Sequence, residues 1–109
     1  MQDSYFEMIE LYLERERLRY FRELELYKQE TLDNFFQYHL NNRGDDWGMD
    51  RLCFLDRREY YHHLVKLSEN RTLTYSIGRM KVIEDFLNFS VNMGWIKKNP
   101  WSTPKEVEE

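Results

Sequence analysis

The chain has 109 residues, of which 41% are hydrophobic and 17% aromatic, so it can bury the core of one compact domain but is too short for a large enzyme. Its single cysteine excludes an internal disulfide and a cysteine-based metal cluster, and we expect Cys53 to be a small buried hydrophobe in the reducing cytoplasm. No apolar run approaches the roughly 18 residues that span a bilayer, so no membrane partner is expected.

Charge is distributed unevenly along the chain, whose formal net charge is -4. Residues 1–50 hold 12 Asp and Glu against 6 Lys and Arg, whereas residues 51–109 hold 8 Asp and Glu against 10 Lys and Arg. Taken whole, the negative charge argues weakly against nucleic acid as a partner. The positive charge, however, is concentrated in the second half, outside its acidic tail.

Helical periodicity dominates the sequence and predicts an all-α domain. We expect a first helix to begin at Ser4, which forms a capping box with Glu7. Its apolar face is formed by Tyr5, Ile9, Tyr12 and Leu13. A second helical pattern ends at Gly44 and has apolar positions at Leu24, Tyr27, Leu32, Phe35, Phe36 and Leu40. The sequence leaves the boundary between these two helices open.

Two further helices are predicted after a loop over residues 44–55, whose last apolar residues we expect in the core. Asp56 is a candidate N-cap, with Glu59 three residues later, for a helix that carries Tyr60, Leu64 and Leu67 and ends near residues 68–70. The next helix has apolar positions at Ile77, Met80, Ile83, Phe86, Leu87 and Val91. Gly94 ends it, and an extended segment over residues 95–101 precedes a polar tail over residues 102–109.

The common enzyme motifs are absent, including the glycine-rich phosphate loops and the serine nucleophile elbow. His62 and His63 are adjacent, so on a helix they point about 100° apart and cannot chelate one metal ion. We therefore predict no catalytic residue, no metal, no cofactor and no small-molecule substrate.

A helix start rich in hydroxyls and cations lies between residues 70 and 81, and this combination suits the phosphates of double-stranded DNA. The candidate DNA-binding residues there are Arg71, Thr72, Thr74, Tyr75, Ser76, Arg79 and Lys81. The plainer alternative is that a threonine caps the helix and that the cations are solvated on its outer face.

The stretch TYSIGRMKVIEDFLNFSVNMGWIKKNPW, residues 74–101, resembles the last helix and exit segment of the core-binding domain of tyrosine recombinases, the phage integrase family. Residues that carry the resemblance are Thr74, Tyr75, Arg79, Met80, Phe86, Phe89 and the exit run from Gly94 to Pro100. The preceding LDRREYYHHLVKLSEN is similar to the family's third helix, and the stretch from Leu32 to Leu40 to its second. The resemblance implies a single four-helix SAM-like bundle over residues 1–101, with a catalytic domain beyond it.

This resemblance makes a DNA-binding domain of a site-specific recombinase the leading hypothesis, with Lys28 as a further contact and self-assembly on DNA in the full-length protein. Strand cleavage would then belong to the absent catalytic domain. Two alternatives stay open. One is a helical protein-interaction module that docks a partner through its acidic, aromatic first half, and the other is an acidic regulator that mimics the charge of DNA.

Overall fold

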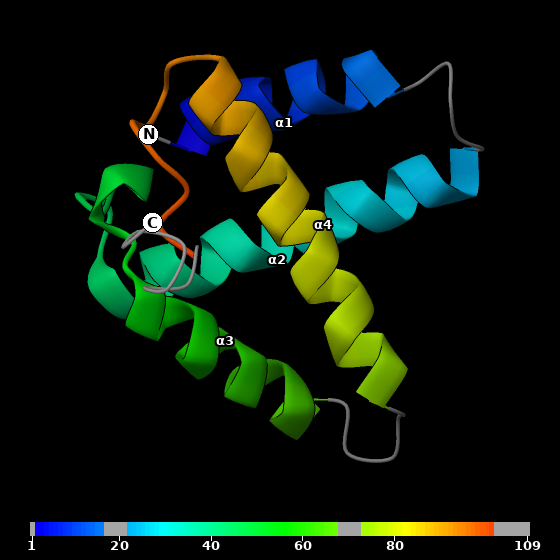
Figure 1. Cartoon of the computed structure of the whole chain (residues 1–109), viewed down its shortest axis with the longest axis vertical. Coiled ribbons are helices and arrows are strands. Elements are labelled where there is room, and N and C mark those ends of the chain that lie inside the picture. Colours follow the sequence, from blue (N-terminus) through cyan, green and yellow to red (C-terminus); the bar gives the residue numbers. More distant parts are fainter. Residues whose placement is uncertain (1, 17–21, 68–72, 102–109) are drawn as a thin grey trace, which may run out of the picture. The chain divides into compact units, whose positions relative to one another are not determined.

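In the computed structural model, described for residues 2–16, 22–67 and 73–101, the fold is all-α (Figure 1). In chain order the elements are α1 (Gln2–Glu16), α2 (Arg22–Arg43), the 3-10 helix η1 (Met49–Arg51), α3 (Phe54–Leu67) and α4 (Leu73–Asn92). The prediction of an all-α fold with four main helices is thus confirmed. The chain forms two compact units, an N-terminal unit, Met1–Trp47, and a C-terminal unit, Gly48–Glu109.

The N-terminal unit is built from α1 and α2, which pack against each other through aromatic side chains. The predicted face of α1 is buried, and the ring of Tyr5 stacks on that of Phe36 with centroids 4.2 Å apart. Trp47, which follows α2, is 1% exposed and stacks on His39 at 4.6 Å. These flat contacts give the unit an aromatic core, in agreement with the predicted apolar positions of α1 and the C-terminal half of α2.

Both predicted glycine stops are confirmed by their geometry. Gly44 has a φ of 91° and its N–H donates to the carbonyl of Leu40, which is the αL cap of α2. Gly94 has a φ of 81°, and beyond α4 the N–H groups of Gly94 and Trp95 donate to the carbonyls of Val91 and Ser90, forming a Schellman motif. Left-handed φ values carry little strain for glycine, so these two residues end their helices.

The predicted helix starts were wrong at two places. α1 begins at Gln2, so Ser4 lies inside its first turn and not at the expected N-cap position. α3 begins at Phe54, two residues before the expected cap Asp56, whose carboxylate instead accepts a hydrogen bond of 2.8 Å from the N–H of Cys53. Asp56 thus satisfies an N-terminal amide from within the first turn, the position that a capping box gives to its acid.

The loop before α3 contributes less to the core than expected. Leu52 and Met49 are buried, but Leu55 is 64% exposed and Cys53 is also exposed, so the prediction of a buried cysteine was wrong. Leu55 belongs to α3, which begins at Phe54. An amphipathic helix buries only one of its faces, and Leu55 lies on the exposed face. The buried face of α3 instead carries Tyr60 and Leu64.

The C-terminal unit closes with an irregular segment after α4. Residues 95–101 form bends and a turn, where the sequence predicted an extended segment. Trp101 is 1% exposed, and its N–H donates to Oδ1 of Asn99 at 2.8 Å. The same asparagine donates from Nδ2 to Oδ1 of Asn88 on α4 at 2.9 Å. The tail 102–109 lies outside the described residues.

Candidate functional site

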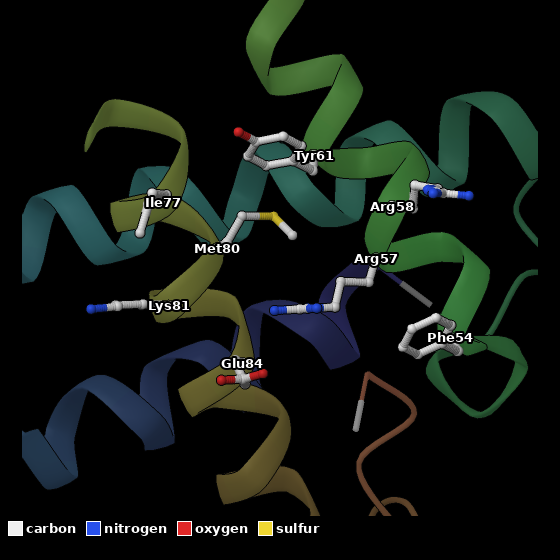
Figure 2. A pocket seen from close by; sticks show the side chains of 8 residues that line it. All are labelled: Phe54, Arg57, Arg58, Tyr61, Ile77, Met80, Lys81 and Glu84. Atoms are coloured by element: carbon white, nitrogen blue, oxygen red, sulfur yellow. The ribbon is translucent and has the colours of Figure 1, made fainter. Parts of the chain in front are cut away.

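A hollow in the surface of the C-terminal unit lies between α3 and α4 and has a volume of about 540 Å³ (Figure 2). We call it the α3–α4 hollow. Its lining residues are Phe54, Arg57, Arg58 and Tyr61 from α3, and Ile77, Met80, Lys81 and Glu84 from α4. Its volume is within the range of about 300–1,000 Å³ that is typical of small-ligand pockets.

Helical spacing explains why these residues share one surface. The four residues of α3 stand at relative positions 0, 3, 4 and 7, and the four of α4 repeat the same pattern. Residues at this spacing lie on one face of a helix. The two faces turn toward each other because α3 packs against α4.

The walls of the hollow are mainly apolar. Phe54 is 38% exposed and Ile77 is 41% exposed, and Tyr61 and Met80 are half-buried. Met80 extends from α4 toward α3 in Figure 2. The prediction that Ile77 belongs to the core of α4 was therefore wrong. Within the predicted stripe of that helix, Ile83, Phe86 and Leu87 are fully buried, whereas Met80 and Val91 are half-buried.

Three cations and one acid accompany this apolar surface among the described lining residues. Arg58 and Lys81 are exposed, whereas Arg57 and Glu84 are half-buried. Figure 2 shows Arg57 reaching from α3 toward α4, while Lys81 points away from α3. The excess of positive charge makes this surface attractive to an anion.

The structure divides the predicted DNA-binding residues into three groups. Lys81 lines the hollow and is exposed. Arg71 and Thr72 lie outside the described residues, and Thr74 lies in the first turn of α4 without a described side chain. The remaining four, which are Lys28, Tyr75, Ser76 and Arg79, have described side chains.

Those four side chains present little surface. Ser76 is 1% exposed, and Arg79 is 7% exposed with its guanidinium 4.6 Å from the centre of the Tyr75 ring, which is itself half-buried. Lys28 is also 7% exposed, and its Nζ donates to the hydroxyl of Tyr12 at 3.4 Å. Burial and aromatic contacts give these side chains a packing role within their own units.

Two cations of the hollow, Arg57 and Arg58, were not among the predicted site residues. Their signal is visible in the sequence, because the aromatic residues Phe54 and Tyr61 stand three or four positions from them on the same helical face. The sequence therefore places two cations and two aromatic side chains on one face of α3.

Two titratable groups in the described part of the chain have shifted pKa values, and neither lines the hollow. Among the described residues, no three His, Cys, Asp or Glu side chains gather closely enough to hold a metal ion. On α3, burial and then the charge of Lys66 lower the pKa of the His63 imidazole, which is outside the hollow. On α2, desolvation and then the carboxylate of Glu10 raise the pKa of Asp33.

None of the helices in the described ranges is both long and apolar enough to cross a bilayer. Comparison of the chain with models of protein families, with curated proteins and with solved structures found no match.

Proposed function

We propose that the chain binds duplex DNA through the cations around the α3–α4 hollow, as the helical binding domain of a tyrosine recombinase-like protein. The observation that carries the proposal is that three cations, Arg57, Arg58 and Lys81, line the hollow from two helices. In Figure 2, Arg57 lies between α3 and α4, whereas Arg58 and Lys81 point outward on either side. Phosphates in a duplex are closely spaced anions, and neutralising them releases condensed counterions.

The described charges of the hollow favour phosphate contacts over base recognition. Arg58 and Lys81 are long, exposed side chains that can follow a phosphate backbone at little cost in desolvation. Glu84 is the one acid among the described lining residues, so the surface retains an excess of positive charge. Contacts of this kind position a protein on DNA without specifying the sequence.

The resemblance of residues 74–101 to the exit of a recombinase core-binding domain supports the same partner. It also gives the surface a role, since such a domain holds one side of the duplex while a separate catalytic domain exchanges strands.

The test is the salt dependence of binding to a labelled duplex of about 20 base pairs, measured by fluorescence anisotropy. A slope of about 0.9 in log K against log salt accompanies each phosphate contact. We therefore expect the double variant Arg58→Ala/Lys81→Ala to lower the slope by about two units if each side chain contacts one phosphate. Lys66→Ala is the matched control, since Lys66 is an exposed cation of α3 outside the lining residues and should leave the slope unchanged.

An unchanged slope in the double variant would remove this surface from DNA binding. Failure of the unmodified chain to bind duplex even at low salt would favour the protein-interaction alternative. For that alternative the N-terminal unit offers exposed apolar side chains, Phe6 at 56% and Leu26 at 50% exposure. Three aromatic residues of this unit, Tyr5, Tyr12 and Trp47, are buried and present little surface to a partner.

A further inference from the structure

We infer that the α3–α4 hollow receives an unpaired nucleotide, with the base against its apolar walls and the phosphate against its cations. The inference deepens the proposed function and rests on it for the choice of a nucleic acid as ligand. It adds that single-stranded or locally unpaired DNA is the form of ligand that fills this site.

The shape of the hollow is the first reason. A paired duplex presents phosphates and sugars at its surface and keeps the apolar faces of its bases stacked inside. Such a surface can contact Arg58 and Lys81 at the rim, but its exposed apolar groups, such as the thymine methyl, are too small to fill a concave space of about 540 Å³. An unpaired nucleotide supplies that group, because its base exposes both of its faces.

The composition of the walls is the second reason. Phe54 and Tyr61 stand seven residues apart on the hollow's face of α3, and Met80 faces them from α4. Aromatic rings stack on nucleobases, and a thioether is a polarizable neighbour for an aromatic ring. Phe54 and Ile77 together leave substantial apolar surface exposed at the hollow, which a base would cover.

The position of Arg57 is the third reason. Its side chain is half-buried and extends across the hollow toward α4, so its guanidinium lies close to any base held there. A guanidinium can donate to a phosphate oxygen and can also stack on a base. Glu84 on the opposite helix opposes a free anion, so we expect inorganic phosphate alone to compete weakly.

The experiment compares two labelled probes, a 12-nucleotide oligothymidine and a duplex of 12 base pairs, by fluorescence anisotropy at one low salt concentration. Truncation of one stacking side chain costs about 1–3 kcal/mol per base, which corresponds to a loss of about 5-fold to 150-fold in affinity. We expect Phe54→Ala to lower the affinity for oligothymidine by at least about 5-fold and to leave the affinity for duplex within about twofold. Arg57→Ala should weaken both.

Matched variants separate stacking from general damage. Leu55 is an exposed neighbour of Phe54 that does not line the hollow. Leu55→Ala should therefore leave both affinities unchanged. Ile77→Ala alters the α4 wall at a residue that is 41% exposed, and should repeat the selective loss of oligothymidine binding. Helical content, followed by circular dichroism, should be the same in all these variants.

The outcomes distinguish this inference from the proposed function. One outcome is that the chain binds duplex, while Phe54→Ala and Ile77→Ala bind oligothymidine as tightly as the unmodified chain does. This outcome would overturn the inference and leave the proposed function intact. A selective loss for oligothymidine in a chain that does not bind duplex would support the nucleotide site and overturn the duplex function. Binding to neither probe would overturn both.

Discussion

Asn99 donates a hydrogen bond of 2.9 Å from its side-chain amide to Oδ1 of Asn88, and this bond ties the segment after α4 back to the helix. The other end of the same side chain accepts the N–H of Trp101 at 2.8 Å. Trp101 is 1% exposed, so Asn99 holds the last described residue of the C-terminal unit in its buried position. The side chain of Asn99 therefore links α4 to the end of the described chain.

Replacement of that asparagine tests its role. Asn99→Ala removes both hydrogen bonds and should lower the free energy of unfolding by about 1–2 kcal/mol, since a net hydrogen bond contributes about 0.5–1.5 kcal/mol. Asn88→Ala removes only the exposed bond and should cost about 0.5 kcal/mol or less. Urea denaturation followed by tryptophan fluorescence measures both values. Equal losses in the two variants would show that the bond to Trp101 contributes nothing.

Gly94 provides a second test, because its φ of 81° is in the left-handed region. A Cβ atom there would meet no heavy atom within 4 Å, so the cost of Gly94→Ala is conformational and should be about 1–2 kcal/mol. In the control Gly48→Ala, φ is -129° and the new Cβ would lie 2.6 Å from Oδ1 of Asp50, an exposed side chain that can move aside. We expect Gly48→Ala to cost about 0.5 kcal/mol or less. A larger cost for Gly48→Ala in urea denaturation would contradict this ranking.

The fold followed from the sequence wherever one physical cause dominated. Apolar residues at helical spacing predicted the buried positions of Phe35 and Phe86, and the two glycines predicted the ends of α2 and α4. Helix starts were less certain, since a side chain such as that of Asp56 can serve an N-terminus either from the cap or from the first turn.

The candidate site was harder to predict, because periodicity alone does not say what an apolar helical face covers. Ile77 continues the same stripe as Ile83, yet Ile83 is 0% exposed and Ile77 lines the α3–α4 hollow. Likewise, Arg79 and Lys81 belong to one basic run, but only Lys81 is exposed. Tertiary packing determines which of these side chains are buried, and the helical spacing in one sequence does not reveal that packing.

Lys28 was expected to contact DNA, but its side chain is buried within the N-terminal unit. Its Nζ is 3.4 Å from the hydroxyl of Tyr12 and 5.4 Å from the centre of the same ring. Lys28→Ala should lower the free energy of unfolding by about 1–2 kcal/mol, because its buried stem and its charge-assisted bond are both lost. Lys28→Met retains most of the stem and should cost less.

The same pair of variants tests Lys28 as a DNA contact. Since this side chain is 7% exposed, we expect neither variant to change the salt slope of duplex binding. A decrease of about one unit in Lys28→Met would instead show that the ammonium group contacts a phosphate.

Asp33 and Glu10 give the N-terminal unit one pH-dependent contribution to its stability. Desolvation, and then the charge of Glu10, raise the pKa of the Asp33 carboxyl above its ordinary value of 3.8. The folded state therefore binds this proton more tightly than the unfolded state does. The stability that this group contributes is complete below pH 3.8 and is lost as the pH rises through the raised pKa of the folded state.

At pH 7 the ionised Asp33 is consequently a source of instability, and Asp33→Asn should increase the urea midpoint. The increase should shrink as the pH is lowered and should vanish below pH 3.8, where the carboxyl is protonated in both states. Glu10→Gln should give a smaller increase at pH 7, because it removes the lesser of the two causes and leaves the desolvation in place. Urea denaturation of the three proteins at a series of pH values provides the measurement. A midpoint that falls at pH 7 in Asp33→Asn would show that the carboxylate stabilises the folded unit, contrary to the sign derived from its surroundings.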